Sequence, residues 1–185
     1  MGAGVEAGLA RVAESLDWLE ERAGEGAPLI CLENTAAPGT VLAGDFAHLG
    51  AIFGLVRNRS RLGVCLDTCH AHAAGYDFAT PDAYHDALAV LEAAVGTGRV
   101  LALHLNDAKG ERGSRLDRHE HLGRGRIGLE CFRLFMNDPR FTGVPKIIET
   151  PKDDGGRQMD PVNLDILRRL VGAKRVPSAL AAEVL

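Results

Sequence analysis

Seven carboxylate and imidazole side chains of this 185-residue sequence end apolar segments or lie shortly beyond them. The seven residues are Glu33, Asp67, His70, His104, Asp117, His119 and Glu149. Carboxylates and imidazoles are the hard and borderline ligands that hold zinc or manganese in hydrolytic sites. Metal ions that lie a few ångströms apart can hold a phosphoryl group and lower the pKa of a bound water. The residue types therefore predict a hydrolytic site with more than one metal ion.

The positions of these residues suggest two groups of ligands. Four of them stand at or near the ends of apolar segments, and three lie in the stretches that follow. The first group is Glu33, Asp67, His104 and Glu149, and the second is His70, Asp117 and His119. In the segment "DRH", alternate residues of an extended loop face the same side, so Asp117 and His119 can reach one ion.

Each of these residues also has a structural interpretation. Asp67 could cap the element that follows its strand, Glu33 could lie in a turn, and Glu149 could simply be exposed. Asp117 and His119 belong to a charged loop, where solvated side chains are the default. The joint pattern favours metal binding, and we expect "LDTCH" to supply metal ligands rather than a helix cap. A structural role is preferred for the other histidines, His48, His72, His85 and His121.

Hydrophobic periodicity places the candidate ligands on alternating strands and helices. Helices are expected over residues 5–23, 45–58, 80–96, 128–138 and 160–172, and strands over residues 27–35, 62–67, 99–107 and 145–151. Four alternations imply parallel strands with crossover helices, and hence an α/β fold in one domain over residues 1–185. The continuous apolar strands favour a sheet that is covered on both faces. Because the strands of a parallel barrel all end on one face, the ligands should converge there.

Two local details belong to this interpretation. The stretch after Asp67, as far as Asp77, is expected to be a loop of small residues, and the tail from residue 173 is left unassigned. The first helix carries apolar residues at helical spacing, which should face the core. These residues are Val5, Leu9, Val12, Leu16 and Leu19.

The composition is that of an ordinary soluble globular protein, with 46% hydrophobic residues and a net charge of −4. No apolar run is long enough to span a bilayer, and the N-terminus lacks the order of a signal peptide, so we expect a cytoplasmic protein without a membrane partner. The spacing of the four cysteines fits neither a zinc knuckle nor a disulfide scaffold. Cys31 and Cys65 are expected to be small buried hydrophobes in a reducing compartment. Cys69 lies beside the candidate ligands.

A basic loop stands out on this acidic chain. Residues 108–126 hold six Lys and Arg residues against three Asp and Glu residues. Such a loop suits a phosphate-bearing substrate, although on charge alone a solvated loop is the preferred interpretation.

Four segments, "LENTA", "GVCLDTCHAHAAGYD", "HLNDAKGERGSRLDRHEHLGRGRIG" and "IIETP", resemble the signature segments of endonuclease IV in the same order. This resemblance implies a TIM barrel with three zinc ions, or Mn²⁺ in their place, that hydrolyses the phosphodiester 5′ to abasic sites in double-stranded DNA during DNA repair. It implies that Glu33 bridges two ions, that the rest of the first group completes one site, and that the second group holds the third ion. Glu33 and Glu149 would be catalytic. The residues expected to contact DNA phosphates are Lys109, Arg112, Arg115 and Arg118.

The resemblance covers only the C-terminal part of the family. We count four strand–helix units where that family has eight, and two histidine ligands from its earlier strands have no counterpart here. We therefore expect a partial TIM barrel, about the C-terminal half, that is N-terminally truncated and weakly active unless a separate N-terminal half joins it. Pro38 in "TAAPG" is a smaller departure, which would stiffen the loop after Glu33.

Two other functions stay open. One is a metal-dependent sugar isomerase or epimerase of the related TIM-barrel group, against which the basic loop argues because a neutral sugar needs no such charge. The other is a non-catalytic half-barrel that binds metal or DNA and cuts nothing, as the two missing histidines would favour.

Overall fold

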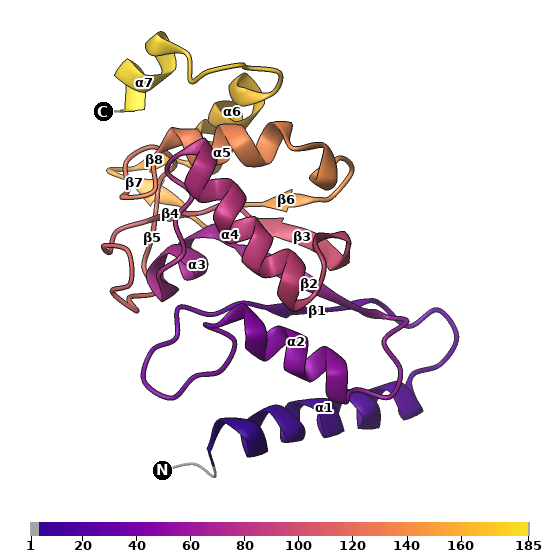
Figure 1. The fold of residues 1–185 in the computed structure, drawn as a ribbon. Helices are drawn as coiled ribbons and strands as arrows, with labels where there is room; N and C mark the ends of the chain where they lie inside the picture. The colour runs from indigo at the N-terminus through magenta and orange to yellow at the C-terminus, as the bar shows by residue number, and fades with distance from the viewer. Residues whose placement is uncertain (1–3, 185) are drawn as a thin grey trace.

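A four-stranded parallel sheet runs through the computed structural model, which describes residues 4–184 (Figure 1). The strands are β1 (Ile30–Glu33), β2 (Leu62–Asp67), β3 (Val100–His104) and β6 (Lys146–Ile147), in the order β1-β2-β3-β6. The register pairs Glu33 with Cys65, Asp67 with His104, and His104 with Ile147. The expected α/β fold with four parallel strands is therefore confirmed. The fourth strand, however, is only two residues long.

Helices alternate with these strands along the chain. They are α1 (Val5–Arg22), α2 (Phe46–Leu55), α3 (Thr68–Ala74), α4 (Pro81–Ala94), α5 (Leu129–Asn137), α6 (Asp160–Leu170) and α7 (Ser178–Val184), with 3-10 turns η1 (Thr97–Arg99) and η2 (Pro139–Phe141). Successive helices contact one another in a row, α1 with α2, α2 with α4, α4 with α5, and α5 with α6 (Figure 1). Because parallel crossovers are right-handed, a sheet whose strands follow chain order carries all its crossover helices on one face. No helix in the described part of the chain is both long and apolar enough to cross a membrane.

The other face of the sheet is open along its outer strands among residues 4–184, whereas all six residues of β2 are buried, so the expectation of a sheet covered on both faces is wrong for the outer strands only. Cys31 is exposed, and Ile147 keeps 44% of its surface accessible. Both lie on the same face as Glu33, because alternate strand residues and registered neighbours share a face. The face that carries the candidate ligands is therefore accessible.

Capping residues mark the starts of α2 and α4. The Asp45 carboxylate accepts a hydrogen bond from the Ala47 N–H at 2.8 Å, and the Thr80 hydroxyl accepts one from the Ala83 N–H at 3.3 Å. Such caps satisfy backbone donors that have no partner within the first helical turn.

The apolar face of α1 is confirmed in part. Leu9 and Leu16 are buried and Val12 packs against the core as expected, whereas Val5 and Leu19 are 49% and 46% exposed. The buried residues of the helix form one stripe. That stripe consists of Leu9, Ala13, Leu16 and Asp17. Asp17 anchors the helix, since its carboxylate accepts hydrogen bonds from the backbone N–H and from Nε of Arg57, both at 2.9 Å.

Several short elements were not expected from the sequence. Helix α3 occupies the stretch predicted to be a loop of small residues, and α7 occupies the unassigned tail. Two antiparallel pairs of two-residue strands are β4 (Asp107–Ala108) with β5 (His119–Glu120), and β7 (Asp153–Asp154) with β8 (Arg157–Gln158). The first pair shapes the basic loop, because it places His119 beside Ala108.

The core lies between the sheet and the row of helices. Phe135 is at the centre of an aromatic cluster, with ring centroids 4.9 Å from Tyr84, 5.4 Å from Phe78 and 5.7 Å from Phe141. All four rings are buried, and the Tyr84 hydroxyl donates a hydrogen bond to Asp138 at 2.7 Å. This packing holds α4 and α5 against the sheet that carries the candidate ligands.

We predict that Leu103→Ala lowers the free energy of unfolding by about 2–5 kcal/mol, because Leu103 is fully buried in β3 and its loss leaves a cavity. Urea denaturation of the metal-free protein measures this change. The matched control is Val90→Ala on α4, where the side chain is 47% exposed and the cost should stay within about 0.5 kcal/mol. Equal effects of the two substitutions would contradict the assigned core.

Candidate metal centre

The structure brings the predicted ligands together at the C-terminal ends of the strands. Glu33 ends β1, Asp67 ends β2, His104 ends β3, and Glu149 follows β6. One donor atom from each of these four residues lies within 4.8 Å of the others. The parallel register explains this, because it aligns the ends of neighbouring strands. The first group therefore forms one cluster.

His104 lies at the centre of this group. Its Nδ1 is 3.1 Å from Glu33 Oε1, 3.1 Å from Glu149 Oε2 and 3.8 Å from Asp67 Oδ2. Three carboxylates around one imidazole give an oxygen-rich set of donors. Such a set suits Zn²⁺ or Mn²⁺.

The second group also lies together. Asp117 Oδ1 is 3.3 Å from His70 Nε2 and 3.5 Å from His119 Nε2. The two groups adjoin each other, because His70 Nδ1 is 3.2 Å from Glu33 Oε1 and His119 Nε2 is 3.9 Å from Asp67 Oδ2. Glu33 thus lies between His70 and His104.

The ring orientations of the second group fit a metal ion. His70 Nδ1 is 2.9 Å from the Asn34 carbonyl oxygen, and His119 Nδ1 is 3.1 Å from the Glu149 carbonyl oxygen. A carbonyl only accepts, so each Nδ1 carries a hydrogen, and Nε2 of each ring, which faces Asp117, is the atom left to bind an ion once it has lost any proton. Among the described residues, the buried Nε2 atom of His119 has no hydrogen-bond partner. A buried nitrogen without a partner is costly unless something binds it, so this donor set fits a metal ion.

Asp67 is both a helix cap and a member of the ligand group. Its Oδ1 accepts a hydrogen bond from the His70 N–H at 2.8 Å, which begins α3, whereas its Oδ2 faces His104 and His119. We expected "LDTCH" to supply ligands rather than a helix cap. That expectation is wrong about the cap, because Asp67 caps α3. Burial raises the pKa of the Asp67 carboxyl, and the neighbouring imidazoles oppose this shift.

Two asparagines that the sequence analysis missed hold the ligands in place. Asn34 Oδ1 accepts a hydrogen bond from the Asp67 N–H at 2.7 Å, and Asn34 Nδ2 donates to the Asp67 carbonyl at 3.1 Å. Asn106 Nδ2 donates to Asp67 Oδ2 at 2.6 Å, and Asn106 Oδ1 accepts from the Glu149 N–H at 2.7 Å. Both are fully buried polar residues just after strand ends, in "LENT" and "HLND", and that position was the available signal.

Asp107, also missed, anchors the loop that carries Asp117 and His119. Its carboxylate accepts four backbone hydrogen bonds, from residues 108 and 127 at 2.9 Å, residue 123 at 2.9 Å and residue 125 at 3.2 Å. The carboxylate is buried, so these four donors replace the water that it has lost. The loop is therefore tied at both ends to one side chain.

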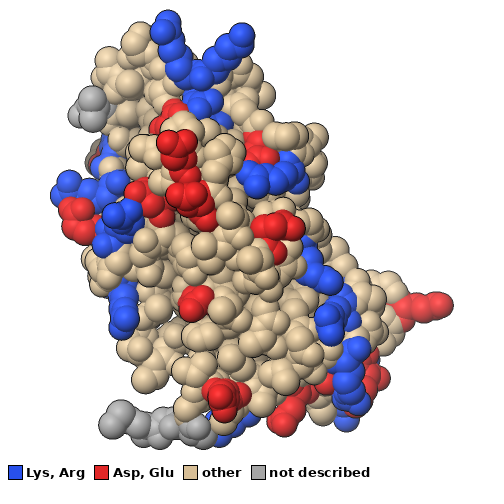
Figure 2. Space-filling model, in the orientation of Figure 1, with Lys and Arg blue, Asp and Glu red and all other residues tan. Residues whose placement is uncertain are grey.

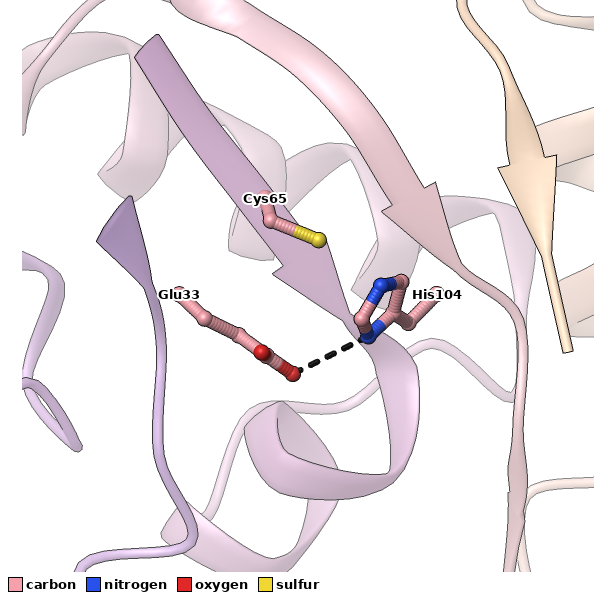
Figure 3. A group of neighbouring side chains, drawn as sticks. All are labelled: Glu33, Cys65 and His104. Carbon is pink, nitrogen blue, oxygen red and sulfur yellow. Dashed lines mark hydrogen bonds and ion pairs between the residues drawn. The ribbon is translucent and has the colours of Figure 1, made fainter. Parts of the chain in front are cut away.

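The burial of the cysteines differs in part from the prediction. Cys31 is exposed rather than buried, because it lies on the open face of the sheet. Cys65 is buried as expected, but its sulfur lies within 4.8 Å of donor atoms of Glu33 and His104 (Figure 3). Cys69 forms a similar group with Asp67 and His119. Both sulfur atoms therefore lie beside candidate ligand atoms.

The remaining histidines lie outside these groups. His48 Nδ1 accepts a hydrogen bond from the Ala43 N–H at 3.1 Å, and His121 Nδ1 is 3.1 Å from Asn163 Nδ2. His72 is buried within α3, and its Nε2 has no hydrogen-bond partner in residues 4–184.

The charges of the centre compensate one another without an ion. Burial raises the pKa of Glu33, but hydrogen bonds from His104 and His70 outweigh it and hold the pKa at about 2. Hydrogen bonds with Cys65 and Glu33 raise the pKa of His104 to about 11. Burial lowers the pKa of His70, but its hydrogen bond to Glu33 and nearby carboxylates outweigh this and raise it to about 9. Both imidazoles are therefore protonated at neutral pH in the metal-free protein.

The basic loop is less positive than its composition indicates. Arg112 pairs with Asp77, Arg124 with Asp154 at 2.7 Å, Arg126 with Glu111 at 3.1 Å, and Lys109 lies 3.9 Å from Glu120. Within residues 4–184, Arg115 and Arg118 form no ion pair. On the molecular face in Figure 2, basic and acidic side chains are interspersed rather than gathered by sign.

Comparisons with known proteins identify the family of this chain. A family profile described as "Xylose isomerase-like TIM barrel" matches residues 2–170. A "Probable endonuclease 4" of Chloroflexus aggregans is 50% identical over 170 residues, which are 92% of this chain and 59% of that protein. One of Trichlorobacter lovleyi is 50% identical over 89% of this chain and 58% of its own length. The crystal structure of endonuclease IV from Thermus thermophilus superposes with a TM-score of 0.74 and 39% identity, over 88% of this chain and 57% of that one.

The chain thus spans less than two thirds of the length of these relatives. The matched part includes the whole parallel sheet and every candidate ligand, because these lie between Ile30 and Glu149.

We predict that the metal-free protein loses stability in alkaline solution. The raised pKa values of His70 and His104 contribute stability that is full below the unfolded value of 6.5 and is lost as the pH rises through about 9 and about 11. The lowered pKa of Glu33 contributes stability above 4.5 that is lost as the pH falls toward about 2. The combined contribution of His70, His104 and Glu33 should therefore peak between pH 4.5 and 6.5.

Urea midpoints of the chelator-treated protein at about pH 6 and about pH 9.5 measure this effect. In His104→Gln the decrease of the urea midpoint between these two pH values should be smaller, because one of the two titrating partners of Glu33 has been removed. A midpoint with the same pH dependence in both proteins would contradict the assigned cluster.

Proposed function

Because the chain belongs to the xylose isomerase-like TIM barrel family, and within it to the endonuclease IV group, we propose that it is a metal-dependent DNA repair endonuclease. Its reaction would be hydrolysis of the phosphodiester 5′ to an abasic site. Family membership confirms the predicted partial TIM barrel. The observation that carries the proposal is that two clusters, each of histidine and carboxylate side chains, adjoin each other at the C-terminal ends of the parallel strands.

We propose Zn²⁺ as the metal. Mn²⁺ is an alternative, because the oxygen-rich group suits it as well. Glu33, Asp67, His104 and Glu149 would hold one ion, and His70, Asp117 and His119 another. When bound, such ions act as Lewis acids that activate water and stabilise the charge on phosphate oxygens. A third ion, which Glu33 would share, is implied only by the resemblance to endonuclease IV.

The residues of the chain divide the remaining work. The Glu149 side chain is 45% exposed, so its carboxylate can reach substrate or water. We assign it the role of accepting a proton from the attacking water. Glu33 lies between the two groups and keeps their spacing. Asn106 orients both Asp67 and the backbone of Glu149, so the proton acceptor and the ligands are positioned by one buried side chain.

The basic loop would hold the DNA backbone. Its backbone is fastened to α3, since the Gly113 and Arg115 N–H groups donate to the carbonyls of His72 and Ala73 at 3.0 and 2.9 Å. Arg115 and Arg118 are the best candidates for phosphate contacts, because neither is paired with a carboxylate in the described residues. Lys109 and Arg112 would contribute less, because each lies near an acidic side chain.

The decisive experiment is incision of an end-labelled duplex with a single abasic site by the zinc-loaded protein. We expect a cut on the 5′ side that leaves a 3′-hydroxyl, and loss of cutting with a chelator. Conversion of a neutral sugar in place of DNA incision would support the isomerase alternative. Binding of metal or DNA without cleavage under any condition would support the alternative of a non-catalytic half-barrel.

We also propose that the missing strands matter for activity, because four strands do not close a barrel that needs about eight. The 185 residues alone should cut slowly. Fusion to the uncovered part of the Chloroflexus aggregans relative, or addition of that part as a separate chain, should raise the rate. Equal rates with and without it would contradict this part of the proposal.

We predict that Glu149→Gln lowers the incision rate by about 10²-fold or more, because a glutamine cannot accept the proton of the attacking water. The Asn106 contact is to the Glu149 backbone, so the local fold should persist. Single-turnover incision at saturating zinc measures the rate. An unchanged rate would remove Glu149 from the catalytic residues.

We predict that Arg115→Ala and Arg118→Ala each weaken binding to abasic duplex and reduce the slope of log affinity against log salt by about 0.9. Binding is measured by fluorescence anisotropy without metal-dependent cutting. Arg22→Ala is the control, because Arg22 lies on α1 and stacks on Trp18 at 4.1 Å, away from the loop. A salt slope that neither loop substitution changes would argue against phosphate contacts.

A further inference from the structure

Cys65 lies directly behind the row of carboxylate and histidine ligands. It is two residues before Asp67 on β2, so both side chains face the same side of the sheet. The register pairs it with Glu33 on β1. Its sulfur, a Glu33 oxygen and a His104 nitrogen all lie within 4.8 Å of one another. Figure 3 shows the three side chains converging from three adjacent strands.

We propose that Glu33, Cys65 and His104 form a further metal site, which takes a thiophilic divalent ion such as Cd²⁺ or Co²⁺ through the Cys65 sulfur. This site overlaps the oxygen-rich group, because Glu33 and His104 belong to both. The identity of the metal then selects between the two arrangements. A hard ion such as Mn²⁺ takes the carboxylates of Asp67 and Glu149, whereas a thiophilic ion moves toward Cys65.

The donor chemistry supports this selection. Sulfur, nitrogen and oxygen donors from three residues are enough for a four-coordinate ion that keeps one open position. When the ion binds, the sulfur–metal and nitrogen–metal bonds form, while the proton of the Cys65 thiol and the proton of the His104 nitrogen that binds the ion pass to solvent, so no oxidant or reductant is needed. The ion and the sulfur share the charge that a buried thiolate could not carry alone.

The site can be reached although Cys65 itself is only 5% exposed. The Glu33 side chain is 34% exposed and the His104 side chain 14%, so an ion can approach across the open face of the sheet. Glu33 would capture the ion first, and Cys65 lies behind it. This order of contact also explains how a buried thiol can take part in binding.

The other cysteines are internal controls. Cys69 forms its own group with Asp67 and His119, but its sulfur faces the Arg118 carbonyl oxygen at 3.7 Å. Cys31 is exposed on the same face and belongs to none of the groups found in residues 4–184. Cys131 is fully buried in α5.

Co²⁺ is the first probe, because cobalt bound to a thiolate gives a near-ultraviolet charge-transfer band that oxygen and nitrogen ligands do not. We expect the band in the unmodified protein and in Cys31→Ser and Cys69→Ser, and its loss in Cys65→Ser and Cys65→Ala. Cd²⁺ affinity should fall about tenfold or more in the two Cys65 variants, with Mn²⁺ affinity nearly unchanged. A band that survives in both, or disappears only in Cys69→Ser, would overturn the proposal.

A second measurement needs no variant. In the unmodified protein loaded with ¹¹³Cd, sulfur ligation moves the cadmium resonance well downfield of sites with oxygen and nitrogen ligands alone. A single resonance in the oxygen–nitrogen region would overturn the proposal even if the Cys65 variants failed to fold. DNA cleavage is not measured in either experiment, so failure of the nuclease proposal and failure of this one are distinguishable.

Discussion

The whole centre depends on one carboxylate that has no contact with water. Asp67 is fully buried, and an isolated ionised carboxylate at such a position would be very unfavourable. The surrounding polar groups are therefore obligatory: a backbone N–H from α3 on one oxygen, an asparagine amide on the other, and imidazoles opposite. Because the same residue starts α3 and ends β2, the position of that helix and the position of the ligand are fixed together.

Shared residues make the two ligand groups one unit. Glu33 Oε1 lies 3.2 Å from His70 and 3.1 Å from His104, so its carboxylate contributes to both. An ion in either group displaces protons from imidazoles and withdraws the same carboxylate from the other partner. An ion bound in one group would therefore alter the metal affinity of the other group. Loss of the shared carboxylate and the positive charge of the first ion would lower that affinity, whereas displacement of protons from the imidazoles would raise it.

The sequence was sufficient for the four strands, the longer helices and the grouping of the candidate ligands, and insufficient for the short segments that connect them. Long amphipathic helices and apolar strands are read from their periods, and residues at strand ends of a parallel sheet must meet, so Glu33, Asp67, His104 and Glu149 could be grouped in advance. Helix α3 was missed because seven residues are too few to show a period, although Asp67 at its start and Gly75 in the left-handed conformation at its end were usable signals. The exposure of Cys31 could not be predicted, because it depends on which strands cover the open face.

The hydrogen bonds of Asp107 have a consequence for the thermodynamics of association. A long loop that is free in solution loses conformational entropy when it closes on a partner, and that loss subtracts from the affinity. Here a single carboxylate already fixes the backbone at four points between residues 108 and 127, so most of this loss occurs during folding instead. The exposed arginine side chains remain to be ordered, but the backbone that carries them is preorganised. Rapid, nearly rigid docking is the expected kinetic behaviour of such a surface.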